Sequence, residues 1–192
     1  MHIQIGRRLA SIFLVSLFSL PSTHAQSTLS QEIDTLPEIV TNYNRHLAGH
    51  LRDGVLTIHL EARRGTWYPE EEEGPGLIVQ AFAEEGQPPQ IPGPLIRIPE
   101  GTEIRATIRN AIPDSTLVIH GLHTRPGNPN DTLVVLPGTV IEVRFKAGAA
   151  GTYFYWATTT HTPFDEREGI DSQLSGALIV DPVGSPLHLT DR

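Results

Sequence analysis

The sequence describes an acidic chain of 192 residues with a formal net charge of −8 at pH 7. An acidic surface repels nucleic acid and anionic membranes, so neither is an expected partner. The chain has no cysteine and only one methionine, Met1, which excludes disulfides, thiolate metal sites and a blue copper centre, since that centre needs a Cys thiolate and usually an axial Met.

The first 25 residues have the three regions of a signal peptide. Arg7 and Arg8 form a basic n-region, residues 9–20 form an apolar run too short to span a membrane, and residues 21–25 are small and polar. We therefore expect export to the periplasm or secretion, with cleavage near Ala25; the alternative is a buried N-terminal helix. The arginine pair leaves the Sec and twin-arginine routes open. No other stretch is long and apolar enough to cross a membrane.

Two segments of irregular composition flank the predicted domain. Residues 26–54 are rich in polar residues and show no clean hydrophobic period, which predicts an irregular N-terminal arm, either flexible or extended and docked on the domain. Residues 183–192 begin with Val-Gly-Ser-Pro and are interpreted as the start of a linker or as a C-terminal tail. The domain itself is assigned to residues 55–182.

Residues 55–182 carry the signals of about eight short strands, with Gly and Pro at most of their junctions. Alternation in residues 55–62 places His59 on the solvent face, and Gly65 opens a loop. Residues 84–94 are predicted to form a Pro/Gly loop without a ladder, and residues 132–136 and 139–145 to form a strand pair. With no convincing amphipathic helix, the pattern predicts an antiparallel Greek-key β-sandwich. The first strand is expected to point four apolar side chains into the core: Leu56, Ile58, Leu60 and Ala62.

Two acidic runs lie in predicted loops. Glu70–Glu73 places four carboxylates in a row, which suits either a recruited cation or, as we prefer, a solvated loop. The second run precedes the last strand and has no EF-hand spacing, so a solvated loop is again favoured over a calcium site. Its members are Asp165, Glu166, Glu168 and Asp171.

The pattern of residues 116–126 predicts a buried strand that ends at His120, and Gly121 and His123 follow it. Two later stretches, 151–161 and 175–182, are expected to pack beside it. His120, His123 and His161 form the one histidine cluster worth testing as a metal site. The odd spacing of the first two requires a bulge, which glycine permits. The alternative is a core His120 bonded to backbone, with the other two in loops.

Hydrolase chemistry finds little support in the sequence. The chain has no Gly-x-Ser-x-Gly elbow. A triad of Ser172 or Ser175 with His161 and Asp165 can be written down, but such triads are defined by geometry and not by composition.

The order of these motifs resembles the first cupredoxin domain of the multicopper oxidases, the laccase-like family. Residues 91–110 are similar to its opening hairpin, and the likeness continues through Ile119–Leu122, Gly151–Tyr155 and Gly176–Val180. It covers about residues 77–182. The resemblance implies a cupredoxin-like (plastocyanin-like) fold, oxidoreductase activity in the complete protein, and copper as the cofactor.

The resemblance also implies which residues would bind copper. Where the family has His-x-His-Gly, this chain has Val118-Ile-His120-Gly, so only His120 matches a ligand position. Where the family has a second His-x-His, this chain has Trp156-Ala-Thr158. The remaining ligands of the family lie in a later cupredoxin domain.

Two functions follow from this comparison. The first is the N-terminal cupredoxin-like domain of a multicopper-oxidase-like protein, whose activity needs further domains. The second is an exported, non-catalytic binding or assembly β-sandwich that has lost its metal site, which Trp156 favours because an indole has no metal-binding lone pair. The implied partners are further cupredoxin domains or another copy of the chain.

Overall fold

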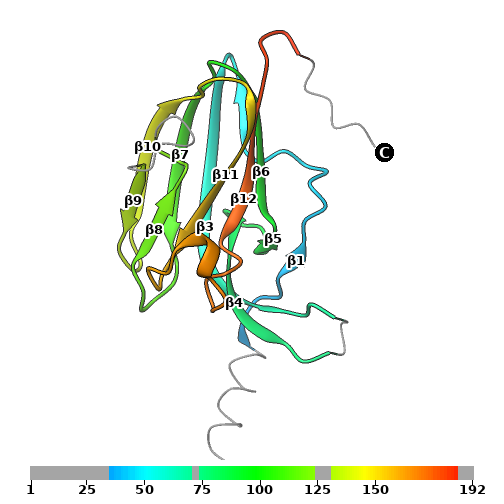
Figure 1. The fold of residues 1–192 in the computed structure, drawn as a ribbon, viewed down its shortest axis with the longest axis vertical. Coiled ribbons are helices and arrows are strands. Elements are labelled where there is room, and N and C mark those ends of the chain that lie inside the picture. The colour runs from blue at the N-terminus through cyan, green and yellow to red at the C-terminus, as the bar shows by residue number, and fades with distance from the viewer. Residues whose placement is uncertain (1–34, 71–73, 124–130, 186–192) are drawn as a thin grey trace, which may run out of the picture.

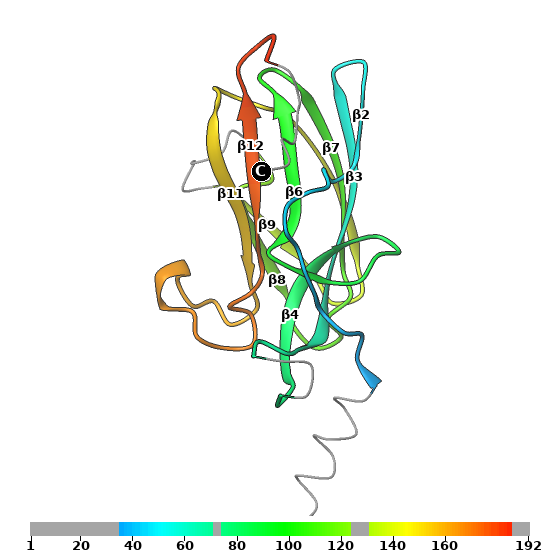
Figure 2. The ribbon, with the colours of Figure 1, turned by 90° about the vertical axis from the view of Figure 1, so that its right-hand side faces the viewer.

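The computed structural model describes residues 35–70, 74–123 and 131–185, which form two β-sheets packed face to face (Figures 1 and 2). The predicted signal peptide, with its cleavage near Ala25, lies outside the described residues. So do residues 26–34 of the arm, the carboxylates 71–73 and the tail from residue 186. Among the described residues, no helix has the length and apolar character needed to cross a membrane.

The first sheet has the strand order β1-β5-β4-β3-β7-β10, and β2 pairs with β3 beside this path. Most of its ladders are antiparallel, but β1–β5 and β3–β7 are parallel. The bounds are β1 (Val40–Thr41), β2 (His50–Arg52), β3 (Val55–Trp67), β4 (Leu77–Glu84), β5 (Gln90–Ile91), β7 (Glu103–Asn110) and β10 (Val140–Lys146).

The second sheet has the order β6-β12-β11-β8-β9, with a parallel pair between β6 and β12. A short 3-10 helix, η1 (Phe164–Glu166), lies in the loop between β11 and β12, and this loop projects from the outer face of the sheet (Figure 2). The strands are β6 (Gly93–Pro99), β8 (Leu117–His120), β9 (Thr132–Val135), β11 (Gly151–Thr158) and β12 (Ser175–Asp181).

The predicted β-sandwich is confirmed, and the core lies between its two sheets. The four inward residues expected in β3 are buried, while His59 on the other face is exposed. Across the core, the ring of Phe82 from β4 meets the ring of Tyr155 from β11 edge to face, with centroids 5.3 Å apart. Burial of these side chains is the main stabilising contribution to the fold.

Three local expectations were wrong. β3 does not end at Ala62 but continues through Gly65, where the N-terminal arm crosses so closely that a Cβ would lie 2.6 Å from Ile39 Cγ1. The Pro/Gly loop 84–94 does contain a short ladder, because β5 pairs with both β1 and β4. The expected strand pair is not a pair: β9 joins β8 in the second sheet, and β10 joins β7 in the first.

The buried side chain of Asn110 explains why the chain crosses between sheets after β9. Its Nδ2 donates to the carbonyls of Ser115 and Val135, at 2.9 and 3.0 Å. Its backbone carbonyl accepts from Gly138 N at 2.9 Å, and its backbone N donates to Thr139 O at 3.0 Å. Because buried polar groups must be paired, this network fixes the crossing segment to the end of β7.

The arm from residue 35 to 52 is extended and lies against the sandwich. β1 pairs with β5, and single bridges join Glu38 to Thr66 and Leu47 to Leu95. Ile39 of the arm packs against Val79 and Ala81 of β4 in a small second cluster of buried apolar residues. The described part of the arm is therefore extended and docked on the sandwich, and it adds β1 and β2 to the first sheet.

Gly176 in β12 gives a test of the core packing. A Cβ at this position would lie 2.4 Å from Cζ of Tyr155, whose ring is fully buried and whose hydroxyl donates to Pro94 O at 2.6 Å. We expect Gly176→Ala to lower the free energy of unfolding by about 1–3 kcal/mol, because the ring has no room to move. The matched control is Gly169→Ala, where the nearest atom is 3.9 Å away. Equal unfolding free energies of the two variants in urea titrations would contradict this packing.

Candidate functional site

His120 ends β8 and lies on the outer face of the second sheet. Its strand neighbours Leu117 and Ile119 are fully buried in the core, so alternation turns Val118 and His120 outward. The imidazole is half-buried there. It is therefore not the core histidine of the alternative considered above, but a residue of the sheet surface.

Trp156 occupies the position opposite His120 on the neighbouring strand. The two residues are register partners in the β8–β11 ladder, and their rings stack with centroids 4.0 Å apart and planes only 7° apart. The guanidinium of Arg167 lies over the same indole, with Cζ 5.0 Å from the ring centroid, and also over Phe164 at 4.9 Å. We call these four residues the aromatic stack. A stack of this kind fills the space beside His120 and stabilises it by dispersion and cation–π attraction.

Arg167 is held in the aromatic stack by the backbone. Its Nη1 donates to Ala157 O at 2.7 Å and to Asp171 O at 2.8 Å. Both partners are neutral carbonyls, and a guanidinium stays protonated in proteins, so a full positive charge lies beside the indole. The loop between β11 and β12 is thereby attached to the outer face of the sheet.

The surroundings of His120 set its protonation. Burial lowers its pKa below the usual value; the nearby Asp131 carboxylate raises it and the Arg167 guanidinium lowers it further. We expect Arg167→Gln to raise the pKa of His120, and Asp131→Asn to lower it, in an NMR titration of the imidazole protons. Shifts of the same sign in both variants would contradict this arrangement of charges.

Thr158, at the last lost ligand position, is bound to a buried carboxylate. Oδ2 of Asp171 accepts from Thr158 Oγ1 at 2.6 Å, Thr159 N at 2.9 Å, Thr160 N at 3.1 Å and Thr160 Oγ1 at 2.8 Å. Burial opposes ionisation of Asp171, but these hydrogen bonds outweigh it and hold its pKa below the usual value. The predicted solvated loop is thus correct for Asp165, Glu166 and Glu168, which are exposed, but not for Asp171.

The structure does not bring the predicted histidine cluster together. Nδ1 of His123 lies 3.7 Å from Asp131 Oδ1, and His161 is exposed on a residue with a left-handed φ of 62°. Within residues 35–70, 74–123 and 131–185, no group of three or more His, Asp or Glu side chains is placed to hold a metal ion. In the same part of the chain, His161 forms no hydrogen bond with Ser172 or Ser175, so the triad finds no support either.

The donor set decides whether a copper cluster fits this face. Imidazole nitrogens are the ligands that such a cluster requires. Of the four positions, only His120 supplies one; Val118 is aliphatic, Trp156 has no lone pair for a metal, and the hydroxyl of Thr158 is bound to Asp171. The residues present do not fit a copper cluster built by this chain.

Sequence reasoning found His120 and Trp156 but missed Arg167 and Asp171. Both lie in the loop after β11, and their roles depend on how that loop folds back onto the sheet. The available signal was the run Thr158–Thr160, whose hydroxyls need an acceptor when buried.

The sequence and the fold are both similar to those of known proteins. The family model described as multicopper oxidase matches residues 86–184. A probable nitrite reductase-hydroxylamine oxidoreductase fusion protein of Kuenenia stuttgartiensis is 31% identical over 154 residues, which cover 73% of this chain and 17% of that protein. The chain therefore spans less than a fifth of this curated relative.

Solved structures give the same fold. Lac15 from a marine microbial metagenome is 27% identical, with a TM-score of 0.52, over 67% of this chain and 33% of that one. A multicopper oxidase from Campylobacter jejuni is 21% identical, with a TM-score of 0.52, over 78% of this chain and 31% of that one; this likeness shows the fold alone. The match of the family model over half of the sequence, on a cupredoxin-like sandwich, shows that this chain belongs to the multicopper oxidase family.

Proposed function

We propose that the chain is a non-catalytic assembly domain of the multicopper oxidase family. Its role is to dock another cupredoxin-type domain through the outer face of the second sheet. The observation that carries the proposal is the flat stack of His120 on Trp156 at 4.0 Å. An aromatic, largely apolar surface stands at the positions where the family has copper ligands. Such a surface is better suited to contact with another protein than to binding a metal ion.

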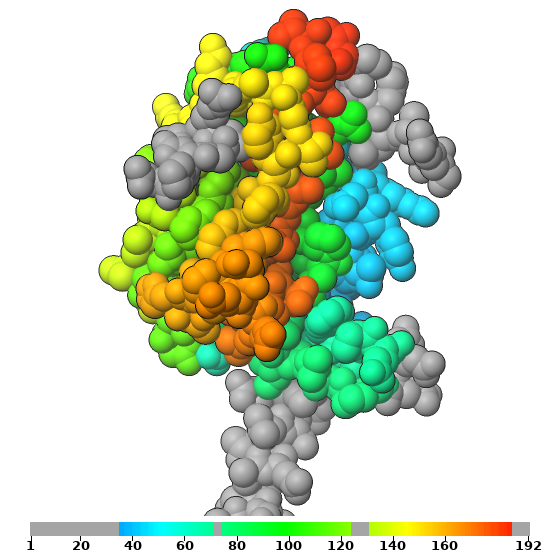
Figure 3. All heavy atoms as spheres, in the orientation of Figure 1, coloured from blue at the N-terminus to red at the C-terminus, as the bar shows by residue number. Residues whose placement is uncertain are grey.

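This face exposes large apolar side chains on either side of the His120–Trp156 pair. Val134 of β9 is 59% exposed and is the register partner of Val118, beside His120. Phe154 of β11 is 51% exposed, and its ring lies 4.9 Å from that of Phe164. Figure 3 shows this side of the molecule, with the loop after β11, in orange, over its lower part. Exposed apolar side chains gathered on one face support an interaction surface there.

The length of the relatives supports a cupredoxin domain as the occupant. The chain spans 33% of Lac15 and 31% of the Campylobacter jejuni oxidase, so these proteins extend well beyond the part that matches. A surface that another domain covers in a longer protein stays exposed when the domain stands alone. We therefore propose that the isolated chain pairs with a second copy of itself, after export and cleavage near Ala25.

The second candidate function is copper binding at His120. It is favoured by the position of this imidazole, half-exposed at the end of β8, where a partner domain can supply further ligands. In that case the chain contributes one ligand to a site shared between domains, and any oxidase activity belongs to the assembly.

Sedimentation velocity of residues 26–192 tests whether the outer face of the second sheet, which we call the docking face, binds a second copy of the chain. We expect the wild-type chain to associate as its concentration rises, and Phe154→Lys to remain monomeric, because a desolvated ammonium opposes contact at this face. The matched control is Val140→Lys, which changes a residue of similar exposure, 53%, on the edge strand β10 of the other sheet. Identical sedimentation of wild type, Phe154→Lys and Val140→Lys at every concentration would contradict the proposal.

A further inference from the structure

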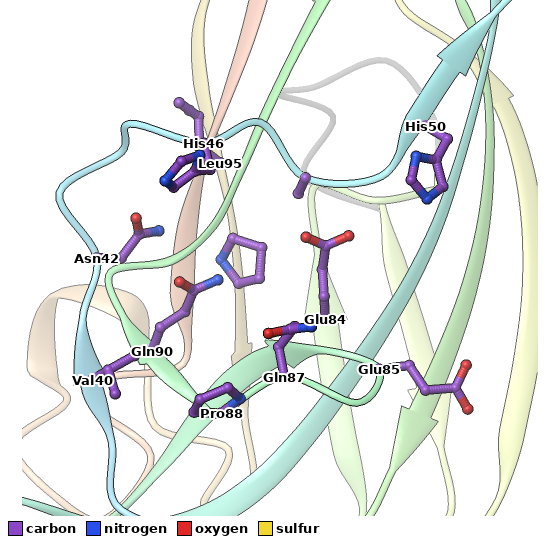
Figure 4. Close-up of a pocket in the computed structure, with 12 residues that line it drawn as sticks. Val40, Asn42, His46, His50, Glu84, Glu85, Gln87, Pro88, Gln90 and Leu95 are labelled. Carbon is purple, nitrogen blue, oxygen red and sulfur yellow. The ribbon is translucent and has the colours of Figure 1, made fainter. Parts of the chain in front are cut away.

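A cleft lies beneath the N-terminal arm, on the opposite side of β6 from the aromatic stack. It has a volume of about 550 Å³ and is bounded by the arm, the turn after β4 and the start of β6 (Figure 4). This volume falls within the range of about 300–1,000 Å³ that is usual for small-molecule sites. Its lining includes Asn42, His46, His50, Glu84, Gln90 and Leu95.

The arm is tied to the sandwich on both sides of this cleft. At one end, Val40 N donates to Pro89 O at 2.9 Å and Asn42 N to Ile91 O at 2.8 Å. At the other end, Ala48 N donates to Leu95 O at 2.8 Å. The arm therefore forms an arch with two fixed ends, and the cleft under it is part of the folded structure.

Glu84 is placed as the anchor of the cleft. Its Oε1 accepts from Gly49 N at 2.8 Å, which fixes the half-buried carboxylate. In Figure 4 this carboxylate points toward the arm, between His46 and His50. A side chain at Gly49 would meet Thr57 O at 2.6 Å, so this close approach of the arm requires glycine. Within the described part of the chain, Gly49 N binds this carboxylate through Oε1, so the second oxygen can accept from a ligand.

The charge of the lining selects the sign of the ligand. Among the described residues that line the cleft, none is Lys or Arg, whereas Glu84 and Glu85 are both present. Oε2 of Glu85 lies 3.6 Å from Nδ1 of His59. The lining repels anions. Within the described residues no group suited to a metal ion is present. Apolar walls accompany the carboxylates, formed by Val40, Ala48, Pro88, Pro94 and Leu95.

We infer that this cleft binds a small organic cation, an alkylamine whose ammonium group pairs with Glu84 and whose carbon chain lies against the apolar part of the lining. An ammonium donates the hydrogen bonds that a fixed carboxylate accepts, and charge-assisted bonds of this kind are the stronger ones. The alkyl part covers the exposed apolar side chains of the lining, those of Val40 and Pro88, and removes them from water. The residues of this cleft are separate from the outer face of the second sheet, which we propose as the docking face.

The test is an NMR titration of residues 26–192 with n-butylamine, and with 1-butanol as the neutral probe of the same chain length. We expect saturable shifts at Gly49 N–H and at the His46 and His50 rings with the amine only. Glu84→Gln is expected to weaken amine binding at least tenfold, while its amide oxygen can still accept from Gly49 N. The control Glu100→Gln removes an exposed carboxylate from a turn elsewhere and is expected to leave binding unchanged.

Three outcomes would overturn the inference. Equal binding of amine and alcohol would mean that the carboxylate is not the anchor. An equal loss in Glu84→Gln and Glu100→Gln would mean that the amine is attracted by the overall acidic charge. No saturation at any probe concentration would mean that the cleft is not a site. The amide NMR spectrum of Glu84→Gln should match that of the wild type. This match shows that weaker amine binding does not come from loss of the fold.

Discussion

Trp156→His is expected to create a Cu(II) site where the chain now has an aromatic stack. Trp156 and His120 are register partners on neighbouring antiparallel strands, and both side chains point to the outer face. Facing residues of such a pair have Cβ atoms about 4.5–5.5 Å apart, so two imidazoles there can share one metal ion. We expect Cu(II) affinity to rise at least tenfold over wild type, measured by calorimetric titration and by nitrogen couplings in the EPR spectrum.

The control for this gain is His120→Ala in the Trp156→His background. Affinity should return to the wild-type level, because one imidazole alone binds Cu(II) weakly at an exposed surface. If Trp156→His gains nothing, or if its gain survives the loss of His120, the two side chains do not face each other as described.

Asp171→Ala is expected to destabilise the chain by about 2–4 kcal/mol, because it leaves several buried donors without an acceptor. The side chain is 1% exposed, and its Oδ2 accepts from the hydroxyls of Thr158 and Thr160 and from two backbone N–H groups. Arg167 also donates to the Asp171 carbonyl, so the loop and the aromatic stack should loosen together. Urea denaturation at pH 7 measures the change, with Glu168→Ala, an exposed residue of the same loop, as the control.

The same carboxylate predicts a dependence of stability on pH. The pKa of Asp171 is lower in the folded chain than its usual value, so the folded state releases this proton more readily than the unfolded state. Its contribution is therefore complete above about pH 4 and is lost as the pH falls below that value. Wild type should lose more stability than Asp171→Asn between pH 5 and pH 3, the range about the usual pKa of Asp. Parallel losses in the two proteins would contradict this role.

The strand interiors were predictable from the sequence, while the pairing of strands was less so. Alternation in β3 identified the core face correctly because side chains on a strand have a period of two. The pair Pro137-Gly138 gave the wrong partner for β9, since the same turn residues serve a hairpin and a crossing between sheets. Whether the chain turns back in a hairpin after β9 or crosses to the other sheet depends on Asn110. This residue is distant in sequence, and its Nδ2 donates to Val135 O.

The candidate site was predictable only as far as local motifs reach. The match of residues 118–121 and 156–158 to ligand positions located His120 and Trp156 on one face. The sequence does not show that their rings stack, or that Arg167 joins them, because these contacts form when a loop folds back. Asp171 was grouped with exposed carboxylates, although it lies between Ile170 and the fully buried Leu174. The cleft at Glu84 depends on where the arm docks, which composition does not reveal.

Native mass spectrometry of residues 26–192 with Cu(II), beside His120→Ala, tests the central claim most directly, because one spectrum reports both assembly and copper. The account predicts a dimer that carries no stoichiometric copper beyond the level of the variant. A monomer with one copper ion per chain, lost in His120→Ala, would contradict it and would show that this face still serves a metal.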